Sequence, residues 1–181
     1  MVILDETSRA ELLRLARHTL EFYISSGRIP EYETENPGLL QLAGAFVSLH
    51  EGEDLRGCIG QITPDQELYR VVQSCVLSAA FEDNRFAPVS GEELPRLNLE
   101  ISVLSPMKEV EDVGEIEVGK HGLYVSRGPR RGLLLPQVAT EYGWSREMFL
   151  ANTCRKAGLP ENAWQEPSTS IRAFEAQVFG E

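Results

Sequence analysis

The chain has 181 residues and carries 17 Lys and Arg against 28 Asp and Glu, a formal charge of −11. With 42% hydrophobic residues and no apolar run near 18 residues, its composition is that of a globular protein and excludes a membrane-spanning helix. The N-terminal residues lack the basic start and long apolar stretch of a secretory signal. Three widely spaced cysteines do not make a disulfide framework. We therefore expect a single cytoplasmic domain over residues 1–181.

The excess of acidic residues disfavours binding to nucleic acids, because such binding relies on basic groups that displace counterions from phosphates. Arg127, Arg130 and Arg131 form the one basic cluster in the sequence. A solvated turn and a contact with an anionic ligand are both compatible with this cluster. We expect no nucleic-acid partner.

Helices are predicted where apolar residues recur at helical spacing. The first is expected to be capped by Ser8 and Glu11 and to end at Gly27. A second, with an apolar stripe from Leu68 to Ala79, is expected to begin at Thr63-Pro64-Asp65-Gln66, which offers a capping pair and a proline at the first position. Two further helices are predicted, a short one from Gln137 and one over residues 145–157.

Strands are predicted where apolar and polar residues alternate, most clearly over residues 97–103. A turn at residues 51–54 is expected to join the first two strands into a hairpin. The predicted strands cover residues 45–50, 55–62, 97–103, 113–118, 123–125, 133–135 and 171–179. Hairpins interspersed with helices indicate the α+β class, with a mostly antiparallel sheet flanked by helices.

The segment LRGCIG, residues 55–60, is the most informative for chemistry. As a strand, it would turn Arg56, Cys58 and Gly60 to one face and the other three residues to the core. At about 6.6 Å, the guanidinium of Arg56 would lower the pKa of the Cys58 thiol by about one to two and favour the nucleophilic thiolate. Gly57 and Gly60 would leave the backbone uncovered for a ligand or another chain. Catalysis, binding and plain packing are all open for Cys58.

Other groups could assist such a thiolate. His121 lies in a loop between two glycines and is a candidate general base. Glu100, on the polar face of the strand over 97–103, could orient His121 or pair with the arginine of LRGCIG. The remaining cysteines, Cys75 and Cys154, fall on apolar helix stripes and are expected in the core. Because the sequence has no CxxC, HExxH, GxGxxG, Walker or GxSxG motif, we expect no metal and no cofactor.

LRGCIG and six further segments, in the same order, resemble the signature of the AMMECR-one domain family. The further segments are FVSL (46–49), DNRFAPV (83–89), LEISVLSP (99–106), GKHGLYV (119–125), LLPQVATEYGW (134–144) and CRKAGLP (154–160). The likeness covers roughly residues 10 to 180. One departure is Asn84, where the family typically has proline; asparagine also suits a turn. The resemblance implies an α+β fold in two unequal subdomains, with the LRGCIG strand bordering a cleft.

The resemblance also implies a cytoplasmic protein with Memo-like or radical-SAM partner proteins, because such domains occur beside or fused to these proteins in many prokaryotes. It implies no settled activity. One hypothesis is a cysteine-dependent enzyme acting on a small molecule or modified substrate, with Cys58 as nucleophile, Arg56 as anion anchor, His121 as general base, and Glu100 and Gln137 in support.

The alternative hypothesis is a binding module without catalysis. The glycine-rich strand face around Arg56, Gly57 and Gly60, together with the turn over residues 127–131, would then receive a partner protein or a small anionic ligand. Cys58 would be there only for its size. An inert Cys58 thiol would favour this alternative, and a reactive one the enzyme.

Overall fold

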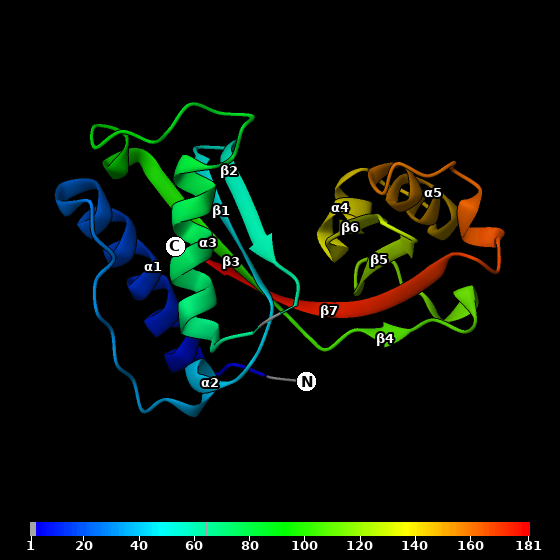
Figure 1. Ribbon diagram of the computed structural model, residues 1–181, viewed down its shortest axis with the longest axis horizontal. Coiled ribbons are helices and arrows are strands. Elements are labelled where there is room, and N and C mark those ends of the chain that lie inside the picture. The colour runs from blue at the N-terminus through cyan, green and yellow to red at the C-terminus, as the bar shows by residue number, and fades with distance from the viewer. Residues whose placement is uncertain (1–2, 64) are drawn as a thin grey trace. The chain divides into compact units, whose positions relative to one another are not determined.

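The computed structural model describes residues 3–63 and 65–181 and divides the chain into two compact units (Figure 1). The first unit comprises Met1–Leu104 and Gln177–Glu181, and the second comprises Ser105–Ala176. The first unit carries 8 basic against 18 acidic residues, a formal charge of −10, whereas the second carries 9 against 10, a charge of −1. Within the described ranges, no helix is long and apolar enough to cross a membrane.

The first unit has antiparallel strands in the order β2-β1-β3, with helices packed on one face. The end of β7 (Ser170–Gly180), from Gln177 onward, also belongs to this unit and lies beside β3. Its elements are α1 (Glu6–Ser26), α2 (Pro37–Leu40), β1 (Ala45–Glu51), β2 (Asp54–Gln61), α3 (Leu68–Phe81), η1 (Leu94–Arg96) and β3 (Leu97–Leu104). The expected hairpin is confirmed: β1 and β2 pair from Ala45↔Gln61 to Glu51↔Asp54, and Gly52 takes the positive φ of 63° that the turn needs.

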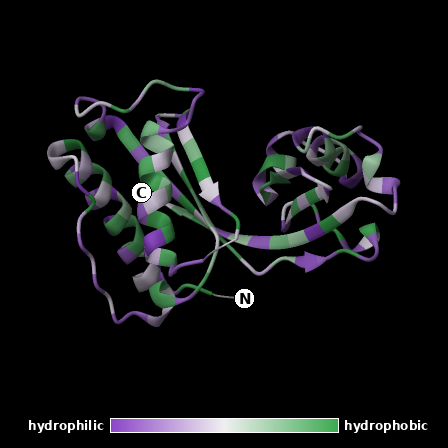
Figure 2. Cartoon of the chain, viewed as in Figure 1, coloured by the Kyte–Doolittle hydropathy of each residue, from purple (hydrophilic) through white to green (hydrophobic). Residues whose placement is uncertain are grey.

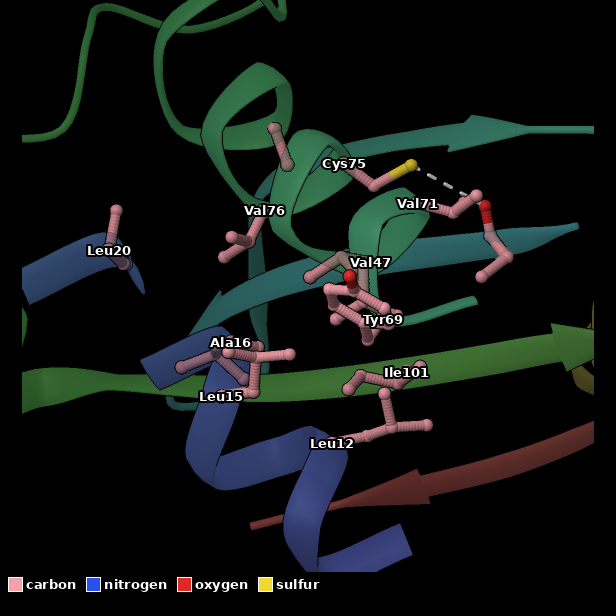
Figure 3. Packing of buried hydrophobic residues seen from close by; sticks show 14 of the residues in the cluster. Leu12, Leu15, Ala16, Leu20, Val47, Tyr69, Val71, Cys75, Val76 and Ile101 are labelled. Atoms are coloured by element: carbon pink, nitrogen blue, oxygen red, sulfur yellow. Dashed lines mark hydrogen bonds between the residues drawn. The ribbon is translucent and has the colours of Figure 1, made fainter. Parts of the chain in front are cut away.

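The helix-covered face of this sheet is the core of the first unit. Along β1, buried residues alternate with half-buried ones, so Ala45, Val47 and Leu49 point into the core. Hydrophobic and hydrophilic residues are interspersed along α1 and α3, as in amphipathic helices (Figure 2). Figure 3 shows Leu12 of α1 and Val76 of α3 in the cluster of buried side chains that includes the strands. The predicted stripe of α3 is therefore confirmed as core.

The second unit is also built on antiparallel strands, in the order β7-β5-β6, with β4 paired to β7. Its elements are β4 (Lys108–Glu109), η2 (Val113–Glu115), β5 (His121–Arg127), β6 (Arg130–Leu134), α4 (Pro136–Glu141), α5 (Arg146–Lys156), η3 (Ala163–Gln165) and, as far as Ala176, β7 (Ser170–Gly180). A separate core beneath α5 includes Phe149 and Cys154. The α+β class with a mostly antiparallel sheet is thus confirmed.

Two predicted helix starts are wrong. The N-cap of α1 is Asp5, whose Oδ1 accepts a hydrogen bond of 2.8 Å from the Ser8 N–H, so the helix begins one turn before the expected cap. Helix α3 begins at Leu68 rather than at residues 63–66, where Pro64 lies outside the described residues. The Leu68 N–H donates to the Gln41 carbonyl at 2.9 Å, so a tertiary contact places this helix start.

The strand predicted over residues 113–118 is also wrong. Residues Val113–Glu115 form a 3-10 helix, because the Asp112 side chain accepts a hydrogen bond from the Gly114 N–H at 2.7 Å and turns the backbone. The short elements α2 and β4 had no periodicity long enough to predict them. The other strands lie where they were predicted, with two differences in bounds. β6 begins at Arg130 rather than at residue 133, and β5 begins at His121, which was expected in a loop. β7 is the longest, at 11 residues.

Candidate functional site

Three polar residues lie side by side across the sheet of the first unit. Two of them, Cys58 and Glu100, are predicted site residues, and the third is Ser48. Ser48 of β1 lies opposite Cys58 of β2 and opposite Glu100 of β3. Because Val47 and Leu49 point into the core, Ser48 and its two cross-strand neighbours lie on the face away from the helices. All three are half-buried. The structure thus brings the predicted Cys58 and Glu100 onto one face, with Ser48 between them.

The rows on either side extend this polar face. Phe46 lies opposite Gly60 and Ser102, and His50 lies opposite Asn98. His50 is two residues from Ser48 and lies on the same side of β1. The strict alternation of β1 is the sequence signal that would have placed Ser48 and His50 on this face.

The Cys58 thiol is held in its neutral form. Burial raises the pKa of this thiol, and this effect outweighs the hydrogen bond from Ser48 Oγ, at 3.2 Å from Cys58 Sγ, and the attraction of the Arg85 guanidinium. The carboxylates of Asp83 and Glu100 raise the pKa further. The expected lowering of this pKa by Arg56 is therefore wrong, because burial dominates and the arginine that attracts the thiolate is Arg85.

Arg56 does not act on the thiol because a bulge takes it out of the strand register. Leu49 pairs with Gly57 and His50 with Leu55, so Arg56 has no partner in β1. Its Nε donates to Glu93 Oε1 at 2.7 Å, and its guanidinium carbon lies 6.0 Å from the centre of the Phe86 ring. Its Nη1 is buried and makes no hydrogen bond to any described residue. Arg56 therefore anchors the segment after α3 to β2.

We expect the Arg56–Glu93 pair to give a measurable acid dependence. Arg56 and two hydrogen bonds from Ser90 lower the pKa of Glu93 to about 2. Because this pKa lies below its unfolded value, the stabilisation is complete above about pH 4.5 and is lost as the pH falls toward 2. Both side chains are less than 20% exposed, at 16% and 18%. In urea unfolding, the stability advantage of the wild type over Glu93→Gln, on the order of 2 kcal/mol at pH 6, should shrink between pH 5 and pH 3. A constant difference would contradict the assignment.

The peptide groups of Cys58 are held by hydrogen bonds to side chains of the segment that follows α3. Asp83, buried just after α3, accepts a hydrogen bond of 2.9 Å from the Cys58 N–H. Arg85 donates to the Cys58 carbonyl at 3.4 Å and binds both oxygens of Asp83, at 2.9 and 2.7 Å. These donors hold the pKa of Asp83 far below its usual range. The segment DNRFAPV, which the sequence marked only by resemblance, therefore fixes the position of Cys58.

The two glycines of the motif serve close packing instead of leaving the backbone uncovered, which corrects the expectation. A Cβ on Gly57 would lie 2.2 Å from the carbonyl oxygen of Ala79, so α3 reaches β2 only because residue 57 has no side chain. A Cβ on Gly60 would lie 2.3 Å from the Phe46 ring, which covers this residue from the neighbouring strand.

The other predicted site residues, His121 and Gln137, belong to the second unit. His121 opens β5, and its Nδ1 accepts a hydrogen bond of 3.1 Å from the Glu117 N–H. Neutral imidazole bonded in this way carries its proton on Nε2 and offers a donor there. Gln137 lies in the first turn of α4, and its Oε1 is buried without a hydrogen bond to any described residue.

Two arginines of the basic turn are engaged within the second unit. Arg127 pairs with Glu166, and Arg130 Nη1 donates to the Gly158 carbonyl at 2.9 Å. The turn therefore presents less free positive charge than its sequence indicates. In the described ranges, no group of three or more His, Cys, Asp or Glu side chains is arranged to hold a metal ion.

A groove of about 420 Å³ lies on the helical side of the first unit. Its lining comes from α1, α3 and the segments beside them and includes Tyr23, Ile29, Leu77 and Phe81. None of the predicted site residues lines it. The candidate site is therefore the polar sheet face around Cys58, Ser48 and Glu100, which we call the Cys58 face.

Comparison with known proteins adds sequence and structural relatives. A family model described as AMMECR1 matches residues 13–179. A protein of Thermococcus gammatolerans is 44% identical, covering 94% of this chain and 88% of the relative. A protein of Methanothermobacter thermautotrophicus is 43% identical, covering 94% and 92%. The crystal structure of an uncharacterised protein, PH0010 from Pyrococcus horikoshii, matches with a TM-score of 0.93 and 40% identity over 100% of this chain and 94% of that one.

Proposed function

The chain belongs to the AMMECR1 family, and we propose that it is a binding module whose Cys58 face receives a partner protein. The observation that carries the proposal is the state of Cys58. Its thiol is kept protonated by burial and hydrogen-bonded by Ser48, and its peptide group is held by Asp83 and Arg85. A nucleophilic cysteine needs the opposite environment, in which the thiolate is favoured. A fixed, neutral thiol suits a packing contact.

The charge of the Cys58 face favours a basic partner. The side chain of Glu100 makes no hydrogen bond or ion pair with any described residue, although it is half-buried. A carboxylate in this position is stabilised by a positively charged group that arrives with a partner. The first unit as a whole carries a formal charge of −10, which attracts a basic surface. A small anionic ligand fits this face less well.

The alkylation rates of the three cysteines test whether the Cys58 thiol is unreactive at neutral pH. We expect the rate of alkylation at Cys58 in the native protein to rise only above the ordinary thiol range, because burial raises its pKa. Cys75 is the internal standard for an inert thiol, since burial raises its pKa to about 11. The measurement is mass spectrometry of each cysteine between pH 6 and pH 10, with the urea-unfolded chain as reference. Selective, fast reaction of native Cys58 at pH 7 would overturn the binding proposal in favour of the enzyme.

Binding to a purified Memo-like protein tests the partner, since Memo-like and radical-SAM proteins are the partner classes that the family resemblance suggests. We expect Glu100→Arg to weaken binding at least tenfold by calorimetry and Cys58→Ser to change it less than threefold. Glu21→Arg, on the exposed side of α1, makes the same charge change elsewhere and should have little effect. Equal losses in both arginine variants would show that only net charge matters. Absence of binding to the wild type would rule out this partner.

A further inference from the structure

The second unit presents an aromatic pair that its own folding does not bury. The Tyr142 side chain is 68% exposed, and its ring stacks on that of Trp144 with centroids 5.0 Å apart and planes 16° from parallel. Trp144 is half-buried and packs against the core of this unit. One face of the Tyr142 ring therefore rests on a ring that is itself supported by the core.

The backbone holds this stack in place. The Tyr142 N–H donates to the Val138 carbonyl at 3.2 Å, and the Trp144 N–H donates to the Ala139 carbonyl at 2.8 Å. Between them, Gly143 takes a positive φ of 62°, which reverses the chain at the end of α4. A partner that uses the pair finds it already ordered, so little conformational entropy is lost on binding.

Two further apolar side chains of the second unit are exposed. Met148, in the first turns of α5, is 50% exposed, and Val118 is 37% exposed. A Cβ on Gly119 would lie 2.9 Å from the Thr140 side chain, which places the loop that carries Val118 against α4. Tyrosine, tryptophan and methionine are the residues enriched where proteins bind one another. We call Val118, Tyr142, Trp144 and Met148 the Tyr142 patch.

The charges beside the Tyr142 patch are mainly acidic. Glu141 and Glu147 are exposed and adjoin Tyr142 and Met148 in the chain. The cation nearest in sequence, Arg146, is held away from a salt bridge, since its Nε donates to the Ile116 carbonyl at 2.9 Å. Glu147 accepts a hydrogen bond of 2.9 Å from Ser145 Oγ, and neither Glu141 nor Glu147 forms a salt bridge with a described arginine or lysine. The second unit thus offers an exposed aromatic ring and, next to it in the chain, carboxylates without a cationic partner among the described residues.

From this combination we propose that the Tyr142 patch is a docking site for an arginine side chain on a partner protein. A guanidinium stacks flat on an aromatic ring while its N–H groups remain free to donate to carboxylates in neighbouring residues. A lysine ammonium satisfies the carboxylates without stacking, and an apolar side chain leaves them without a partner. This site is independent of the Cys58 face, because it lies in the other unit and shares no residue with it.

The test uses the full chain and a labelled peptide, acetyl-Gly-Arg-Gly-Arg-Gly-amide, followed by fluorescence anisotropy at low salt. We expect the peptide with citrulline in place of arginine, which has the same shape without the charge, to bind at least fivefold more weakly. Tyr142→Ala should weaken binding of the arginine peptide at least fivefold, and Tyr142→Phe, which keeps the ring, less than twofold. The double change Glu141→Gln and Glu147→Gln should weaken it at least threefold.

Matched controls separate this site from general attraction to an acidic protein. Phe22→Ala removes an aromatic ring that is 36% exposed on α1 of the first unit, and Glu21→Arg reverses an exposed charge on the same helix; neither should change peptide affinity more than twofold. Circular dichroism and melting temperature should show that Tyr142→Ala folds normally. The proposal is overturned by equal binding of the citrulline peptide, by unchanged affinity in Tyr142→Ala, or by no binding of the arginine peptide to the wild type.

Discussion

Replacement of Asp83 by alanine is expected to lower the free energy of unfolding by about 3 kcal/mol, because a buried acceptor of several charge-assisted hydrogen bonds is lost. The Asp83 side chain is 4% exposed. It accepts from the Cys58 N–H and from three N–H groups of Arg85, at 2.7 to 3.2 Å. In the variant, Arg85 regains water, but the Cys58 N–H faces a cavity. Urea unfolding at pH 7, followed by circular dichroism, measures the loss.

Two controls define the origin of this loss. Asp112→Ala removes an exposed aspartate that accepts one backbone hydrogen bond, from Gly114, and should cost about 1 kcal/mol or less. Asp83→Asn keeps the shape but replaces one acceptor oxygen by a donor, so its cost should lie between the two. Alkylation of Cys58 should also accelerate in Asp83→Ala, since the strand is no longer held. A loss equal to that of Asp112→Ala would show that Asp83 does not anchor Cys58.

The second large effect is expected at Gly57. Alanine there places a Cβ 2.2 Å from the Ala79 carbonyl oxygen, a backbone atom that cannot rotate away. Either α3 shifts away from β2 or the strand distorts, and we expect a loss of about 3 kcal/mol, the upper end for overpacking. The measurement is again urea unfolding, with the expressed soluble fraction at 20 °C as a second readout if the variant unfolds during purification.

Substitutions at two other glycines should cost less stability and serve as controls. Gly60→Ala meets the Phe46 ring, a side chain that can move, so it should cost less than Gly57→Ala. Gly91→Ala meets only Ile24, at an ordinary 3.4 Å, and should be neutral within about 0.5 kcal/mol. If Gly57→Ala were as stable as Gly91→Ala, the close approach of α3 to β2 would be wrong.

Local periodicity was sufficient for the elements that carry the core. The stripe of α3, the alternation of β3 and the turn at Gly52 depend on residues within a few positions of one another, so the sequence predicts them directly. The start of α3 could not be predicted in this way. Its first N–H is bound by Gln41, and residue Glu67 forms an isolated bridge with Leu42. Both partners lie about 25 positions earlier in the chain, where no local pattern points to them.

In the candidate site, too, local patterns predicted some features, while tertiary packing determined the others. Alternation correctly placed Cys58 on the face away from the core and Glu100 on the corresponding face of β3. It failed for Arg56, because a bulge moves this residue out of register and Glu93, 37 positions away, binds it. The pKa of Cys58 depends on burial, which follows from the packing of the whole unit. An isolated arginine–cysteine spacing therefore could not indicate the charge state of the thiol.

The division of the chain also sets an order of assembly during translation. Residues Gln177–Glu181 complete the first unit, where Glu181 binds Arg17 and the Leu99 N–H. A ribosome synthesises all of Ser105–Ala176 before it reaches them. The second unit can therefore acquire its own core while the first unit still lacks its closing segment. A nascent chain that stalls before Gln177 leaves α1 and β3 without that segment, and should be more sensitive to proteases in the first unit than in the second.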